Sequence, residues 1–390
     1  MEAFGRRARG RPIAISSLAP HQEYASRGAM SRPVWDPLGQ VRALMAIVKP
    51  VLLRSLQRSL RSLGGERAPV LAGHKLLYRC NLECKMCPFW RREDEPLLGL
   101  ADEIRMMEAL AKAGVSFLGF EGGEPLLRPD LGAILREAHD RFHTSLVTNG
   151  WLLARRLREI APHLDLLFVS IDGIGERHDR LRGIPRSFER AVDGLRASRS
   201  EVPSIISHTV TRENLDHSEK VVELAEQLDV GLTLQIAYDY RTADPMSPDR
   251  AKLRPVIERL RDLRRSGAPI LESVEYFEAI LGSWYGERPW RCKPWLTINI
   301  DPAGRIVLPC YVLQEYRGSE PVWSVDLRQL WNRYDWSRYE GCNRCALACY
   351  LEPSLFRWTD FACLRDRLLD GAIHYAERRP RTSRRGIVSG

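Results

Sequence analysis

The sequence predicts an α/β fold in which a partial (β/α)6 barrel of the TIM type follows an N-terminal helical segment and precedes a small cysteine-rich C-terminal domain. Three observations support this prediction. Short β-branched and aromatic runs alternate with stretches of helical length through the middle of the chain. The loops between these runs are short. The nine cysteines form an early triplet and a later group, which is typical of metal ligation in a reducing compartment rather than of secreted disulfides.

The N-terminal region divides into two parts. Residues 1–36 are rich in Arg, Ser, Pro and Gly and are expected to be disordered, with Met30 as an alternative start of the chain. Residues 37–72 repeat Leu at helical spacing with Arg on the other side, and Pro50 is expected to divide them into two helices. The basic amphipathic helix over 51–63 fits two interpretations, packing across the bottom of a barrel or contact with an anionic membrane surface.

The barrel core is expected over residues 73–240. Parallel sheets built from β/α units have right-handed crossovers, and in such barrels the chemistry lies at the carboxyl ends of the strands. The predicted strands cover residues 75–79, 115–120, 145–147, 166–170, 204–210 and 232–236, and the predicted helices cover 130–140, 151–161, 187–198 and 214–228.

Three further segments are expected beyond the core. Residues 241–290 are expected to form a helical linker, 291–372 the cysteine-rich domain and 373–390 a basic tail. Within the cysteine-rich domain, residues 295–304 predict a hairpin with its turn at Asp301–Gly304.

The positive charge of the chain lies at its two ends. Residues 1–72 carry 12 Lys and Arg against 4 Asp and Glu, and residues 373–390 carry 5 against 1, which leaves the body between them at −3 within a total of +9. A nucleic-acid enzyme more often carries a basic stripe on its body, so no nucleic-acid partner is expected. No apolar run is long enough to span a bilayer and no signal peptide is evident, so we expect a cytoplasmic protein with at most peripheral membrane contact.

Three cysteines in one loop carry the strongest functional signal. Cys80, Cys84 and Cys87 have the spacing C-x3-C-x2-C directly after an apolar run. Thiolates are soft ligands that suit zinc or iron–sulfur clusters. Because a [4Fe–4S] cube has four irons, three thiolates leave one iron open for chemistry, much as a catalytic zinc keeps one open position. The alternatives are a zinc knuckle or unligated core thiols.

This loop resembles the cysteine motif of the radical S-adenosylmethionine (SAM) enzymes, and the resemblance extends over roughly residues 75–363. It implies that the open iron binds the amino and carboxylate groups of SAM, which an electron then cleaves to methionine and a 5′-deoxyadenosyl radical that abstracts a substrate hydrogen. It also implies a low-potential electron donor such as flavodoxin or ferredoxin.

The resemblance also assigns cofactor-binding residues at the ends of the predicted strands. Several have structural alternatives: Asp172 suits an Asx turn, Asn214 a helix N-cap and Arg182 a solvated arginine, while Glu124 is expected to shape its loop rather than to touch SAM. The set comprises the GGEP motif Gly122, Gly123, Glu124 and Pro125 for the amino group, Thr148, Asn149, Ser170 and Asp172 for the ribose side, Arg182 for the carboxylate, and Thr209, Thr211, Asn214 and Gln235 for the methionine or adenosine moiety.

A second cysteine group resembles the SPASM/twitch auxiliary-cluster extensions of radical SAM proteins, although Cys345-x3-Cys349 is narrower than the full SPASM spacing. At least one auxiliary [4Fe–4S] cluster is expected, and a structural zinc site is the alternative, since C-x2-C is equally a zinc spacing. The expected ligands are Cys292, Cys310, Cys342 and Cys345, with Cys349 and Cys363 as substitutes.

The expected function is therefore radical abstraction of hydrogen from a substrate, leading to oxidation or to carbon–carbon or carbon–sulfur bond formation. A peptide is one substrate class, because many SPASM-bearing relatives modify peptides. A small metabolite or lipid is the other, supported by the basic helix over 51–63. The alternative to an enzyme is a non-catalytic scaffold protein that binds an iron–sulfur cluster or zinc.

Overall fold

A computed structural model describes residues 67–355, except 94 and 291. No helix within this described part is long and apolar enough to cross a membrane. The predicted features that lie outside it are the tail at 1–36, most of the segment at 37–72 including the helix over 51–63, the tail at 373–390, and Cys363.

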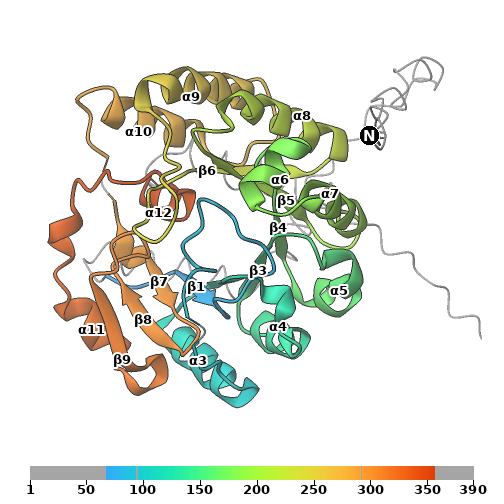
Figure 1. The fold of residues 1–390 in the computed structure, drawn as a ribbon. Helices are drawn as coiled ribbons and strands as arrows, with labels where there is room; N and C mark the ends of the chain where they lie inside the picture. Colours follow the sequence, from blue (N-terminus) through green and yellow to red (C-terminus); the bar gives the residue numbers. More distant parts are fainter. Residues whose placement is uncertain (1–66, 94, 291, 356–390) are drawn as a thin grey trace, which may run out of the picture. The chain divides into compact units, whose positions relative to one another are not determined.

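The described residues form one nine-stranded sheet in the order β6-β5-β4-β3-β2-β1-β7-β8-β9 (Figure 1). The first six strands pair in parallel, as six β/α units predict, and β7 pairs in parallel with β1. The last two strands add as antiparallel neighbours. The strands are β1 (Leu71–Lys75), β2 (Phe117–Glu121), β3 (His143–Thr148), β4 (Leu166–Ser170), β5 (Ser204–Val210), β6 (Gly231–Ile236), β7 (Thr297–Ile300), β8 (Arg305–Leu308) and β9 (Tyr316–Pro321).

The helices between the parallel strands lie in an arc around the outside of the strands, which gives the predicted partial barrel (Figure 1). Each helix buries one apolar stripe; the stripe of α4 repeats at helical spacing through Leu131, Ile134, Leu135 and Ala138. The helices are α3 (Leu100–Ala113), α4 (Leu131–His139), α5 (Leu153–Ile160), α6 (Glu176–Arg182), α7 (Ser187–Ser198), α8 (Ser218–Leu228), α9 (Arg250–Arg265), α10 (Val274–Trp284), α11 (Leu327–Arg333) and α12 (Ala348–Leu355).

One predicted strand is displaced along the chain. The first strand was expected at 75–79, but β1 ends at Lys75, where its register with Glu121 of β2 ends. Beyond that point the backbone bonds to the turn after β2: the carbonyls of Leu77 and Arg79 accept the N–H groups of Gly123 and Glu124 at 2.7 and 3.0 Å. The apolar run is therefore buried as a loop against that turn and not as a strand.

The predicted hairpin is confirmed, and it is continuous with the barrel sheet. β7 and β8 pair antiparallel, and the Gly304 N–H closes the turn on the Asp301 carbonyl at 3.0 Å. Because β7 pairs with β1, the cysteine-rich region extends directly from the strand that precedes the first cysteine loop. The sheet therefore carries both cysteine groups.

Candidate active site

The first cysteine loop follows β1 and carries its three thiols in different environments. Cys84 is buried, whereas Cys80 and Cys87 are half-buried. Backbone N–H groups of Leu82 and Phe89 donate to the sulfurs of Cys80 and Cys87, each at 3.4 Å. Burial raises the pKa of Cys80 to about 11 and that of Cys84 to about 12. Thiols of this kind become thiolates when a metal binds them, because coordination deprotonates the thiol.

The glycines of the GGEP motif are required by the protein backbone itself. A Cβ on Gly123 would lie 2.1 Å from the carbonyl oxygen of Arg79, and one on Gly122 would lie 2.4 Å from that of Leu77. Gly122 also has φ +147°. The chain leaving β1 toward the cysteines runs directly over this turn, so the two glycines fix where the cysteine loop begins. Pro125 starts a short 3-10 helix after the turn.

Glu124 joins the ends of β2 and β3. Its carboxylate is fully buried and accepts the Thr148 hydroxyl at 2.7 Å, the Asn149 backbone N–H at 2.8 Å and the Leu126 backbone N–H at 3.0 Å. The Asn149 side-chain amide then lies 3.8 Å from the sulfur of Cys80. Glu124 thus holds Thr148 and Asn149 together, and Asn149 contacts the cysteine loop.

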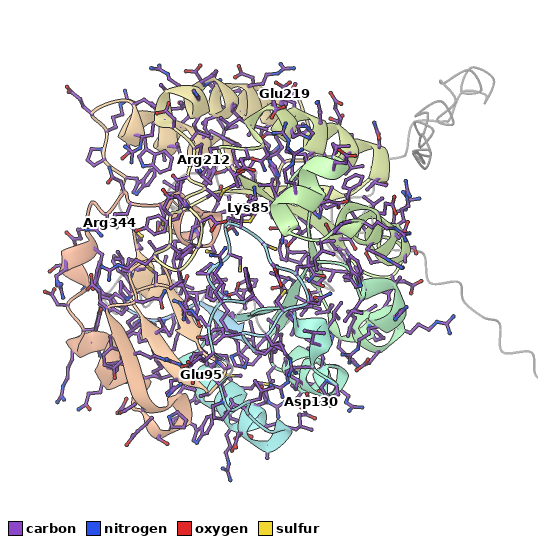
Figure 2. The ribbon with its side chains drawn as sticks, in the orientation of Figure 1. Lys85, Glu95, Asp130, Arg212, Glu219 and Arg344 are labelled. Atoms are coloured by element: carbon purple, nitrogen blue, oxygen red, sulfur yellow. The ribbon has the colours of Figure 1, made fainter. Side chains whose placement is uncertain are left out.

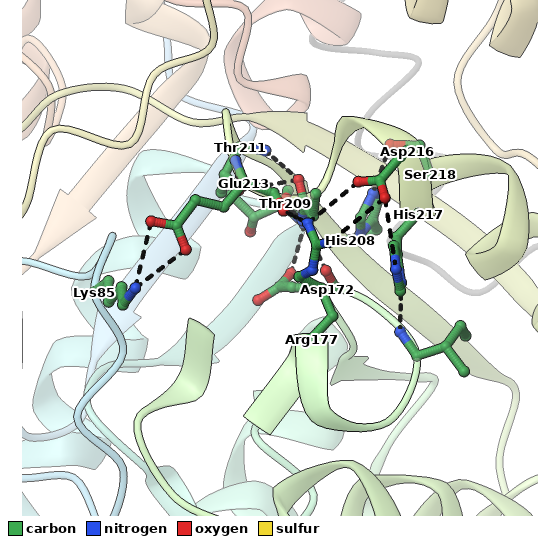
Figure 3. A network of polar contacts seen from close by, with 12 residues as sticks. Lys85, Asp172, Arg177, His208, Thr209, Thr211, Glu213, Asp216, His217 and Ser218 are labelled. Atoms are coloured by element: carbon green, nitrogen blue, oxygen red, sulfur yellow. Dashed lines mark hydrogen bonds and ion pairs between the residues drawn. The ribbon is translucent and has the colours of Figure 1, made fainter. Parts of the chain in front are cut away.

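A second network surrounds Asp172 at the end of β4 (Figure 3). Asp172 is fully buried and accepts the Thr209 backbone N–H at 2.7 Å through Oδ1, while its Oδ2 lies 2.6 Å from a guanidinium nitrogen of Arg182. The Asn214 amide donates to the carbonyls of Asp172 and Thr209 at 2.7 and 2.8 Å, and its oxygen accepts from Thr211. Asn214 therefore ties two loops together and makes no side-chain cap of the following helix.

The remaining predicted residues lie on the strands beside these networks. Ser170 is the last residue of β4 and pairs in register with Ser207 of β5. Gln235 on β6 pairs with Thr209 on β5 and is half-buried. The structure thus brings the predicted residues of β2 to β6 around one edge of the sheet, at the carboxyl ends of its parallel strands.

Two functional neighbours were not predicted. The ammonium of Lys85, between Cys84 and Cys87, pairs with Glu213 at 3.1 Å and anchors the loop to the segment after β5 (Figure 3). His178 is fully buried, and its Nδ1 accepts the Asp172 backbone N–H at 3.0 Å. Burial lowers the pKa of His178 to about 3, so the ring stays neutral and remains an acceptor. The contact of Lys85 with Glu213 spans 128 positions of the sequence and leaves no local pattern to detect.

Four of the C-terminal cysteines line one cavity. Cys292, Cys310, Cys342 and Cys345, the predicted ligands, border it together with aromatic and aliphatic side chains. Cys349 is not among the lining residues and its side chain is exposed. Burial raises the pKa of Cys310 to about 11 and that of Cys345 to about 12.

Two tryptophans hold the C-x2-C segment in place. The indole N–H of Trp290 donates to the carbonyl of Cys342 at 2.7 Å, and that of Trp284 donates to the carbonyl of Asn343 at 2.9 Å. Figure 2 marks this segment by Arg344 and the first cysteine loop by Lys85.

An aromatic contact joins the two cysteine groups. Phe89, two residues after Cys87, lies edge-on to Tyr311, the residue after Cys310, with ring centroids 5.4 Å apart. The ammonium of Lys75 lies 4.1 and 4.9 Å from the centroids of these two rings. The segment that follows Cys87 and the segment that follows Cys310 are therefore packed together.

Both donor sets fit iron–sulfur clusters. Each consists of sulfur alone, the ligand type of these clusters. Thiolates around a single zinc ion all lie about 2.3 Å from it, whereas in a cube each thiolate binds a different iron. Within residues 67–355 as described, no three His, Cys, Asp or Glu side chains are gathered as one ion requires.

Two family models match the chain. Residues 75–225 match the model described as "Radical SAM superfamily", and residues 232–367 match one described as "Domain of unknown function (DUF3463)". Among curated relatives, the PqqA peptide cyclase of Granulibacter bethesdensis is 25% identical over 299 residues, 70% of this chain and 78% of that protein. The AdoMet-dependent heme synthase of Methanosarcina barkeri is 38% identical over 168 residues, 41% of this chain and 48% of that protein.

Solved structures share the fold. SuiB of Streptococcus suis bound to S-adenosylmethionine superposes with a TM-score of 0.57 at 17% identity, covering 81% of this chain and 76% of that one. Native anSMEcpe with bound AdoMet and a Cp18Cys peptide gives 0.52 at 18% identity, covering 78% of this chain and 99% of that one.

Proposed function

This chain belongs to the radical SAM superfamily as an enzyme with a SPASM-like C-terminal region, and we propose that Cys80, Cys84 and Cys87 hold its SAM-cleaving [4Fe–4S] cluster. When bound, the cluster and SAM would supply a 5′-deoxyadenosyl radical that removes a hydrogen atom from the substrate. The observation that carries this proposal is the three-thiol loop at the carboxyl end of β1, held between the Glu124 and Asp172 networks.

The chain's own residues support this chemistry by fixing the loop. Gly122 and Gly123 allow the turn after β2 to lie against the chain that leads to Cys80. Glu124 joins that turn to Thr148. These contacts hold the loop that carries the three thiols in one position. A cluster that must keep one iron accessible requires ligands that are fixed in this way.

We further propose one auxiliary [4Fe–4S] cluster at Cys292, Cys310, Cys342 and Cys345. Four sulfurs at one cavity match the four irons of a cube, and Trp284 fixes the backbone of the C-x2-C segment. A cluster with four protein ligands suits transfer of an electron from the substrate or structural support. Cys349 lies outside the cavity lining and stays a predicted substitute ligand.

The relatives divide between two substrate classes. A peptide is supported by the longer match, to a peptide cyclase, and a small molecule by the more identical but shorter match, to a heme synthase. A low-potential flavodoxin or ferredoxin is the proposed electron donor. Contact of residues 51–63 with an anionic membrane, which would favour a lipid substrate in an otherwise cytoplasmic protein, stays a prediction from sequence.

The test is SAM cleavage itself, which needs no knowledge of the substrate. The full chain, reconstituted without oxygen with iron and sulfide, is given SAM and dithionite, and 5′-deoxyadenosine is measured by chromatography. We expect 5′-deoxyadenosine from the wild type and none from Cys80→Ala. An iron-replete wild type that forms none would identify the protein as a non-catalytic scaffold. Peptide and lipid fractions are then compared for the class that accelerates formation.

A further inference from the structure

We propose that Arg182 sets the reduction potential of the cluster at Cys80, Cys84 and Cys87 by donating to the sulfur of Cys84 from a position that Asp172 fixes. This inference rests on the proposed function. It assigns Arg182 a role toward the cluster that is independent of SAM.

The end of α6 is built against the middle of the cysteine loop. The Lys85 N–H donates to the carbonyl of Leu181 at 3.0 Å. Gly183 has φ +81°, and a Cβ there would lie 2.7 Å from the carbonyl oxygen of Glu83. The residues on either side of Arg182 thus contact the residues on either side of Cys84, which fixes the two side chains relative to each other.

The guanidinium of Arg182 bridges Cys84 and Asp172. One terminal nitrogen lies 3.7 Å from the sulfur of Cys84, and the other lies 2.6 Å from Oδ2 of Asp172. The Arg182 side chain is 12% exposed and Cys84 is buried. The planar guanidinium of arginine is suited to bind two partners at once, whereas the ammonium group of lysine is not.

Asp172 cannot turn away from this arrangement. Its Oδ1 accepts the Thr209 N–H, its carbonyl accepts the Asn214 amide and its own N–H donates to the neutral ring of His178. Every polar group of this residue therefore has a partner, and Arg182 is positioned by a rigid carboxylate.

In the described part of the chain, Arg182 is the charged hydrogen-bond donor to the thiols of the first cysteine loop. Cys80 receives the Leu82 N–H and the Asn149 amide, and Cys87 receives the Phe89 N–H, all of them neutral. Charge-assisted hydrogen bonds are stronger than neutral ones, and more so where water is excluded. Arg182 therefore makes the one charge-assisted hydrogen bond to these thiols within the described residues.

The sign of the effect follows from charge. Reduction adds one negative charge to the cluster, and a buried cation stabilises the more negative state. Potentials of iron–sulfur clusters depend on net charge, hydrogen bonds to sulfur and exposure. Loss of the Arg182 charge must therefore make the cluster harder to reduce.

The experiment is a redox titration of the SAM-free, reconstituted full chain, following the paramagnetic signal that Cys80→Ala lacks. We expect Arg182→Gln to shift the midpoint potential to a more negative value, and Arg182→Lys to shift it less in the same direction. Arg180→Gln, which removes the same charge from an exposed position on α6, is the matched control and should titrate as the wild type.

An unchanged SAM-free potential in Arg182→Gln overturns the inference, even if SAM then binds more weakly, because Arg182 would contact SAM alone. If the glutamine variant assembles no cluster, the lysine variant decides, and a wild-type potential there overturns the inference. A wild type that assembles no cluster at Cys80, Cys84 and Cys87 contradicts the proposed function instead.

Discussion

The carboxylate of Glu124, at the end of β2, accepts the backbone N–H of Asn149, at the end of β3, at 2.8 Å. Two neighbouring strands of the barrel are joined by this buried contact, and Asn149 in turn contacts Cys80. Glu124 therefore acts on the cysteine loop through contacts within the protein.

Replacement of Glu124 by Gln tests this role. The amide places an N–H₂ group against either the Asn149 N–H or the donors at Oε1, so one buried donor loses its partner at a cost of about 1–3 kcal/mol. We expect the melting temperature of the anaerobic protein to fall by several degrees. Glu108→Gln, at an exposed position on α3, serves as the control. Equal melting of the Glu124 and Glu108 variants would contradict this account.

Gly123 should not tolerate a methyl group. Because a Cβ would lie 2.1 Å from the Arg79 carbonyl oxygen, Gly123→Ala must displace the chain leading to Cys80, with a loss of about 1–3 kcal/mol and of iron. Calorimetry and iron analysis measure both effects. Gly231→Ala is the matched control, since its nearest contacts are 3.4–3.6 Å away. Normal iron content in the Gly123 variant would show that the loop can shift freely.

Loss of a cysteine from the first group and loss of one from the second should have different effects on SAM cleavage, although both should lower the iron content. Cys84→Ala is expected to remove about four irons per chain and all SAM cleavage, because it takes a ligand from the open cluster. Cys345→Ala is expected to lower iron by a similar amount and to leave SAM cleavage that is uncoupled from product. Iron analysis and 5′-deoxyadenosine measurement are made on the same samples. Unchanged iron in the Cys345 variant would show that the cavity holds no cluster.

Glu272 should make the protein less stable as the pH rises. Its carboxyl is buried beside Thr233, and one oxygen has no partner. Burial raises its pKa to about 8 from the ordinary value of 4.5. The folded state therefore holds a proton that the unfolded state releases between these values. Stability is fully present below about pH 4.5 and is lost as the pH rises through about 8.

Glu272→Gln removes this dependence because an amide does not titrate in this range. As the pH rises from 6 to about 8, we expect the free energy of unfolding of the variant to increase relative to that of the wild type, by up to about 1.4 kcal/mol per pH unit. The melting temperature of the variant should rise relative to the wild type over the same range. Glu223→Gln, exposed on α8, should follow the wild type. Parallel melting curves for the wild type and the Glu272 variant across this range would mean that Glu272 does not titrate there.

Local patterns predicted much of the fold. The bounds of β4, β5 and α7 coincide with the predicted 166–170, 204–210 and 187–198, because their apolar residues recur at strand or helix spacing between clear turns. Four helices were missed, α3, α6, α11 and α12. α6 is seven residues long, too short for a periodic pattern, and its end is defined by contacts with the cysteine loop.

The sequence pointed to residues that the structure gathers at the carboxyl ends of the strands, but it did not predict the contacts between them. The cysteine spacing and the strand ends predicted which side chains gather. The pairing of Arg182 with Cys84, 98 positions away, depends on the tertiary fold and has no local sequence signal. The ion pairs of Glu95 with Arg305 and Arg317, on β8 and β9, also depend on the tertiary fold.

The most direct test of the central claim is the electron paramagnetic resonance spectrum of the reduced, reconstituted protein before and after addition of SAM. If Cys80, Cys84 and Cys87 hold a cluster with one open iron, SAM binding to that iron will shift the signal, and the shift will be absent in Cys87→Ala. A reduced cluster whose spectrum is identical with and without saturating SAM would contradict the account.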